Sequence, residues 1–109
     1  MPKYITIQYG DRAGYDRTPP DIRQAAHEHD ASLTRRGVVM GIAGTPVPVR
    51  NLNGSGILTE TGPYLSSELP IAGFSMMEAK DINEAIAMAS KSPCAVAHGV
   101  IEIWPLKEQ

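Results

Sequence analysis

Apolar and polar side chains alternate in residues 3–9, a pattern that predicts a β-strand ending at the Gly10-Asp11 turn. Every second side chain of a strand points to the same face. We expect Ile5 and Ile7 to pack against helices. The opposite face then carries three other side chains, Tyr4, Thr6 and Gln8.

Residues 10–18 are polar and predict a loop, and the segment after them predicts a long helix. We expect Thr18 to cap this helix and Pro19 to occupy its first position. Gly37 suits the position after the helix end at Arg36. The stripe predicted to face the sheet consists of Ile22, Ala26, His29 and Leu33.

A second helix is predicted to begin after Asp81, which forms a capping box with Glu84, and to end at Pro93. Its buried face is expected to carry Ile82, Ala85, Ile86 and Ala89.

Further extended segments are predicted at 38–43, 49–51, 55–60, 71–79 and 97–105. Asn53-Gly54 lies between two of them and is a strong hairpin signal. The predicted order is therefore strand, helix, strand, hairpin, strand, helix, strand. This order predicts an α+β fold of the ferredoxin-like split βαβ type with an extra β-hairpin, in which two helices cover one face of an antiparallel sheet.

The helix-free face of such a sheet is expected to carry Tyr4 from the first strand, together with His98, Val100, Glu102 and Trp104 from the last strand. This combination is too apolar to stay in water and too polar for a sealed core. A second copy of the chain would cover it, so the sequence predicts a homodimer with a semi-polar interface.

The length and composition of the chain exclude several classes of protein. The 109 residues suffice for a single domain, 1–109, with one core. A net charge of −2 argues against a protein built to bind nucleic acid directly. Cys94 is the single cysteine, which excludes an internal disulfide framework and favours a plain thiol. No apolar run is long enough for a membrane span or a signal peptide, so we expect no membrane association and a cytoplasmic protein.

Several short motifs, taken in order, resemble the DGPF-motif branch of the YCII-related family over nearly the whole chain. They are the opening strand with its Tyr9-Gly10-Asp11 ending, Thr61-Gly62-Pro63-Tyr64 in place of Asp-Gly-Pro-Phe, Ala72-Gly73-Phe74, the acid-capped helix at 81–89 and the closing run at 99–106. The resemblance implies a dimeric α+β barrel built from two ferredoxin-like subunits. It also implies kinship with lyases and isomerases that use acid–base chemistry, some with a His–Asp pair, and with proteins encoded beside or fused to alternative sigma factors.

Three departures from the family pattern bear on function. Thr61 replaces the motif aspartate, Trp104 replaces an arginine, and Ser66-Ser67-Glu68 replaces a stretch rich in lysine and glutamate. Chemistry that depends on that aspartate or arginine is not expected here.

His29 is the candidate general base, because an imidazole titrates near neutral pH. Tyr9, expected on the helix side of the first strand, and Asp11, in the loop beyond it, are the candidates for orienting His29 or a ligand. The position of His29 on the helix stripe fits equally well with a packed histidine that is held by one hydrogen bond.

His27 and Asp30 are neighbours on the helix and form either a second His–Asp candidate or a solvated surface pair.

His98, Glu102 and Trp104 are the candidates for substrate binding, with an interfacial polar network as the alternative. We expect no metal site, because His27 and His29 are two residues apart on a helix and point in different directions. We expect no cofactor either, since the glycine-rich run 53–56 precedes a strand and lacks the helix N-terminus of a phosphate site.

Two functional classes remain open. The first is a small lyase or isomerase that transfers protons on a small polar or aromatic compound. The second is a non-catalytic module that binds a ligand or serves as a sigma-factor-associated accessory protein. An enzyme needs two or more titratable groups converging in a pocket, whereas a binding module needs an apolar lining and one or two polar anchors.

Overall fold

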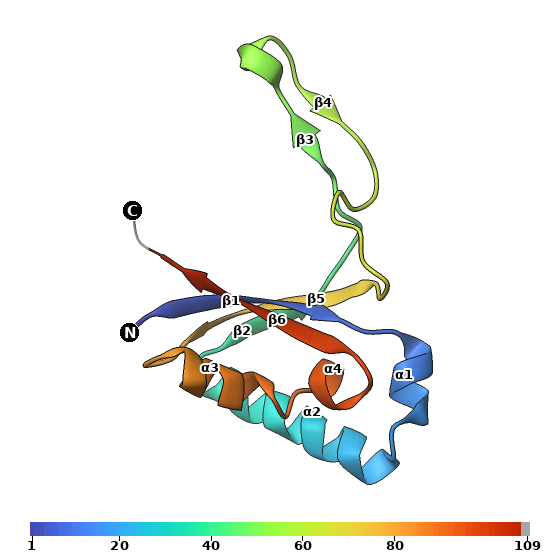
Figure 1. Ribbon diagram of the computed structural model, residues 1–109, viewed down its shortest axis with the longest axis vertical. Coiled ribbons are helices and arrows are strands. Elements are labelled where there is room, and N and C mark those ends of the chain that lie inside the picture. Colours follow the sequence, from blue (N-terminus) through green and yellow to red (C-terminus); the bar gives the residue numbers. More distant parts are fainter. Residues whose placement is uncertain (108–109) are drawn as a thin grey trace.

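The structure, a computed structural model, describes residues 1–107 (Figure 1). Its centre is a four-stranded antiparallel sheet in the order β2–β5–β1–β6, with bounds Val39–Ile42, Ile71–Glu78, Lys3–Tyr9 and Val100–Leu106. Three helices cover one face, α2 (Pro20–Arg35), α3 (Ile82–Ala89) and α4 (Pro93–Val96), and α1 (Arg12–Arg17) lies at one end of the sheet. β3 (Val49–Arg50) and β4 (Leu58–Thr59) form a separate hairpin on the other side. The predicted α+β fold with an antiparallel sheet and an added hairpin is confirmed.

The core lies between the helices and the even-numbered side chains of β1. Tyr4 is buried with Leu33 and Met77, and Thr6 is fully buried, with its hydroxyl hydrogen-bonded to that of Ser75. The expected assignment of the two faces of β1 is therefore wrong, because Ile5 and Ile7 face away from the helices. Alternation defines two faces, but packing against the other elements decides which one is covered.

The segment predicted as a loop contains α1. Asp11 caps this helix by accepting a hydrogen bond from the backbone N–H of Gly14 at 2.8 Å. The hydroxyl of Thr18 donates to the carbonyl of Gly14 at 2.9 Å, so Thr18 closes α1 rather than capping the long helix. The long helix, α2, has Pro19 at its N-cap and no side-chain cap.

Both main helices bury fewer residues than their predicted stripes contain. Ala26 and Leu33 of α2 are buried as expected, whereas Ile22 is exposed. On α3 the buried side chains are Ala85, Met88 and Ala89, and the predicted Ile82 and Ile86 are exposed instead.

The helix-end signals had mixed outcomes. Gly37 follows α2 with a φ of +98°, a conformation that favours glycine, as predicted. The capping box is also confirmed, since the Asp81 carboxylate accepts from the N–H of Glu84 at 2.9 Å. Pro93, however, begins the short α4 rather than ending the preceding helix, and Pro105 lies inside β6, an edge strand. No helix in residues 1–107 has both the length and the apolar character needed to cross a membrane.

Candidate functional site

The sheet face opposite the helices, which we call the open face, is largely apolar. In the strand register Ile5 lies between Met76 and Trp104, and Ile7 lies between Phe74 and Glu102. Odd-numbered side chains of β1 therefore align with even-numbered side chains of β5 and β6 on this face. Its exposed large apolar side chains are Val39, Phe74, Met76, Val100, Trp104 and Leu106.

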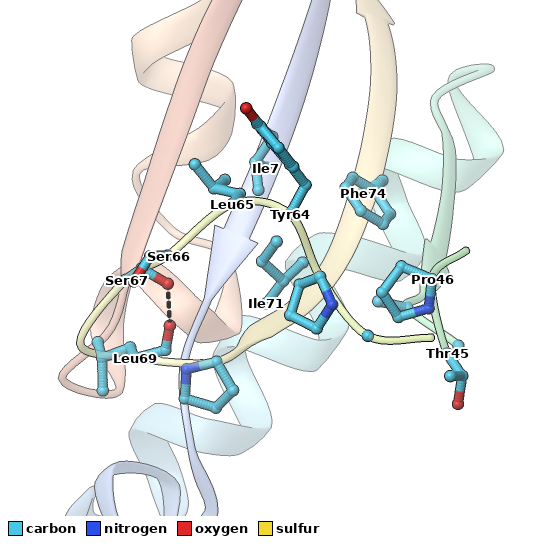
Figure 2. Close-up of a pocket in the computed structure, with 15 residues that line it drawn as sticks. Ile7, Thr45, Pro46, Tyr64, Leu65, Ser66, Ser67, Leu69, Ile71 and Phe74 are labelled. Atoms are coloured by element: carbon cyan, nitrogen blue, oxygen red, sulfur yellow. Dashed lines mark hydrogen bonds between the residues drawn. The ribbon is translucent and has the colours of Figure 1, made fainter. Parts of the chain in front are cut away.

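One end of the open face is partly covered by the chain itself. Residues 62–70 cross back over the sheet and, together with it, border a cavity of about 1020 Å³ that is partly open to solvent (Figure 2). Ile7 and Phe74 line it from the sheet, and Tyr64 and Leu65 line it from the crossing segment. Tyr64 is the single titratable side chain among the lining residues within the described part of the chain. The remaining polar side chains in the lining are the hydroxyls of Thr45, Ser66 and Ser67.

Backbone restrictions hold the crossing segment in place. Gly62 has a φ of +103°, which a residue with a side chain rarely adopts, and its N–H donates to the carbonyl of Pro46 at 3.1 Å. At the other end the N–H of Gly10 donates to the carbonyl of Pro70 at 3.1 Å. The first bond joins the start of the crossing segment to the chain between β2 and β3, and the second joins its end to the residue that follows β1.

A polar cluster on the open face adjoins this cavity. The Glu102 carboxylate accepts hydrogen bonds from the indole N–H of Trp104 at 2.8 Å and from the hydroxyl of Tyr9 at 3.3 Å. Burial raises the pKa of Tyr9, and the negative charge of Glu102 raises it further. The cluster lies beside Ile7, which lines the cavity. Tyr9 thus faces away from the helices, contrary to the expectation from the sequence.

His29 lies on the helix side of the sheet, opposite the side that carries Tyr9. Its Nε2 donates to the carbonyl oxygen of Met88 at 2.6 Å and so links α2 to α3. The ring is half-buried and lines none of the described cavities. Since Asp11 caps α1, the structure does not bring His29, Tyr9 and Asp11 together.

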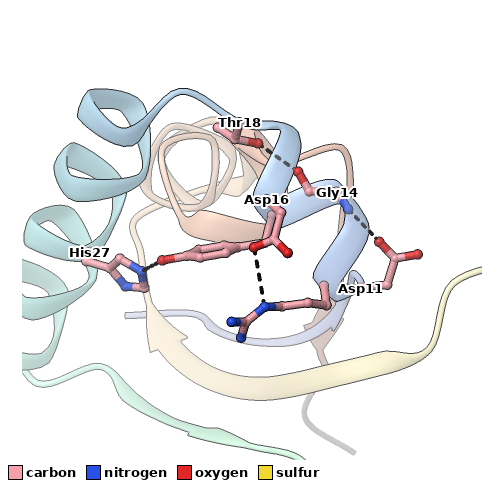
Figure 3. A network of polar contacts seen from close by, with 7 residues as sticks. Asp11, Gly14, Asp16, Thr18 and His27 are labelled. Carbon is pink, nitrogen blue, oxygen red and sulfur yellow. Dashed lines mark hydrogen bonds and ion pairs between the residues drawn. The ribbon is translucent and has the colours of Figure 1, made fainter.

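The two other histidines lie apart from the open face as well. His98 is exposed in the turn before β6 with a φ of +63°, so the expectation that it shares a strand face with Glu102 is wrong. His27 shares a hydrogen bond with the hydroxyl of Tyr15 at 2.7 Å instead of pairing with Asp30 (Figure 3). In residues 1–107 no three histidine, cysteine or acidic side chains cluster closely enough to hold a metal ion.

Of the six predicted site residues, the structure therefore brings together Tyr9, Glu102 and Trp104. The residues of the crossing segment that line the cavity are absent from the candidates predicted from the sequence, because 61–64 has the pattern of a turn and 65–70 that of a loop. The signal was present, since Tyr64, Leu65 and Leu69 make this segment unusually apolar for a solvated loop.

Neither the protein-family models nor the curated proteins compared with this chain gave a match. The resemblance to the YCII-related family therefore stays a prediction.

Proposed function

We propose that the protein is a homodimer that binds a small, largely apolar molecule at the open face of its sheet. The observation that carries this proposal is the cavity of about 1020 Å³ under residues 62–70, lined mainly by apolar side chains. Ligand sites commonly combine a lining of this kind with a few polar groups that orient the ligand. Here the hydroxyls of Tyr64 and Ser66 supply such groups, whereas that of Ser67 donates to the carbonyl of Leu69.

The homodimer is supported by the apolar area of the open face. The exposed parts of its large apolar side chains amount to roughly 600 Å². A standard interface buries about 800 Å² per partner, of which a little over half is apolar. A second copy packed face to face would therefore cover an area typical of a stable complex.

We also propose that the fold is a ferredoxin-like split βαβ that pairs into a dimeric α+β barrel. The strand order β2–β5–β1–β6, with every neighbouring pair antiparallel and the main helices on one face, is the arrangement of a ferredoxin-like split βαβ. Two such sheets packed through their open faces make a dimeric α+β barrel, and the ligand cavity would then lie in the barrel interior.

The test uses the purified chain and the fluorescent apolar probe 8-anilinonaphthalene-1-sulfonate. We expect the probe to bind, and Tyr64→Ala and Phe74→Ala to weaken its affinity by about five- to tenfold, the equivalent of about 1 kcal/mol per aromatic contact. Ile86→Ala is the matched control, because Ile86 is exposed on α3 and does not line the cavity. Equal affinity in all four proteins would count against the site.

An acid–base lyase or isomerase is the second candidate, and the observation in its favour is the Glu102 cluster. A carboxylate held by Tyr9 and Trp104 next to an apolar cavity is suitably placed to accept a proton from a bound molecule. The test is exchange of carbon-bound protons for deuterium in a panel of small carbonyl compounds, followed by NMR. We expect exchange that is lost in Glu102→Gln and kept in His29→Gln, and no exchange with the unmodified protein would exclude this candidate for the panel.

A further inference from the structure

Residues 46–62 form an arm that leaves the body of the protein on the side of the open face (Figure 1). Backbone hydrogen bonds hold the arm together, from Glu60 N–H to the carbonyl of Pro48 and from Gly62 N–H to the carbonyl of Pro46, each at 3.1 Å. The β3–β4 pair continues it, and the tip turns at Asn53 and Gly54, both at positive φ. The arm is therefore a formed hairpin.

The arm has no core of its own. Every residue from 49 to 61 is exposed. Its two charged side chains are Arg50 and Glu60. The large apolar side chains that it holds in water are Val47, Val49, Leu52, Ile57 and Leu58, each at least 58% exposed. An isolated two-stranded hairpin is marginally stable in water, and an exposed apolar surface of this kind usually marks an interaction site.

We propose that the arm of each copy clasps the other copy of the homodimer, an inference that rests on the dimer proposed above. The direction in which the arm points favours a second copy of the chain as its partner. It rises from the side of the sheet on which the second copy would sit, and the helices lie on the other side (Figure 1).

The arm is also long enough to reach past the sheet of a second copy. Packed sheets lie about 10 Å apart. About eight residues separate Pro46 from the tip, which spans roughly 25 Å of extended chain. An arm of this length passes beyond the facing sheet and runs alongside the partner's body. Because Val49 pairs with Thr59 and Leu58 pairs with Arg50, the apolar side chains are divided between the two faces of the arm. The face that meets the partner adds roughly half of their exposed area, about 250 Å², to the interface.

A photo-cross-linking experiment tests the contact directly. Benzophenone maleimide is attached to Ile57→Cys, in a Cys94→Ser background that removes the natural thiol. We expect ultraviolet light to produce a covalent dimer on a denaturing gel. Ile86→Cys in the same background is the control, because Ile86 is exposed on α3, away from the open face, and should give no covalent dimer.

Sedimentation of the full chain distinguishes the two levels of the proposal. We expect the double variant Leu52→Ser with Ile57→Ser to raise the dimer dissociation constant at least tenfold, and Ile86→Ser to leave it unchanged. A dimer in solution whose arm gives no cross-link would overturn the clasp and leave the homodimer standing. A monomer at all concentrations that still binds the apolar probe would overturn the clasp and the homodimer together, but not the cavity.

Discussion

Replacing His29 by alanine tests whether this histidine is a structural link or a catalytic base. The variant removes the hydrogen bond from Nε2 to the carbonyl of Met88. That carbonyl lies in the last turn of α3, where backbone acceptors lack partners within the helix. A hydrogen bond of this kind contributes about 0.5–1.5 kcal/mol, and the lost packing of a half-buried ring adds about 0.5 kcal/mol. We expect His29→Ala to lower the free energy of unfolding by about 1–2 kcal/mol more than a matched control on the same helix does.

The matched control is His27→Ala, on the same helix two residues earlier. Alanine favours helix over histidine by about 0.5 kcal/mol, and this gain is common to both variants. His27 is exposed, so its bond to Tyr15 is expected to add little. Urea unfolding followed by far-ultraviolet circular dichroism measures the difference, at one protein concentration because a dimer unfolds in a concentration-dependent way. A difference below about 0.3 kcal/mol between the two variants would refute the structural role.

Three further predictions concern the core, the polar cluster and a tight turn. Leu33→Ala should cost about 2–5 kcal/mol in urea unfolding, because Leu33 is 1% exposed and its loss leaves a cavity; a loss under 1 kcal/mol would contradict this packing. Glu102→Gln should lower the pKa of Tyr9, as measured by ultraviolet titration of the phenol, and an unchanged titration would contradict the contact. Because folding raises the pKa of Tyr9, its contribution to stability is present below about pH 10 and is lost as the pH rises through the folded-state value. Gly99→Ala should cost about 2 kcal/mol in the same unfolding assay, because its Cβ would collide with the main-chain oxygens of Tyr9 and Cys94, and unchanged stability would contradict that close approach.

Local signals in the sequence predicted most of the regular elements. Alternation over residues 3–9 predicted β1 with its observed bounds, and the Asp81 capping box predicted the start of α3. Gly37 and Asn53-Gly54 marked positions of positive φ. Each of these features depends on residues within a few positions of one another, so a short stretch of chain determines it.

The sequence was less informative where a local pattern is compatible with two structures and contacts between distant residues decide which one forms. Residues 10–18 are polar enough for a loop, yet Asp11 caps a short helix there, and Thr18 then serves that helix rather than the next one. The stripe on α2 contained His29 on periodicity alone. Only the position of α3 in the structure showed that the ring of His29 forms a hydrogen bond with the carbonyl of Met88.

Taken by itself, the sequence determined the element order, the α+β class and the presence of a hairpin. Tertiary structure alone decided which face of β1 is buried, which of the candidate residues meet, and where the cavity lies. The reason is the separation of the contacts involved. Tyr9 meets Glu102 across 93 positions, and Thr6 meets Ser75 across 69. No local pattern encodes such pairs, because they form only when the strands have found their register and the helices have covered one face of the sheet.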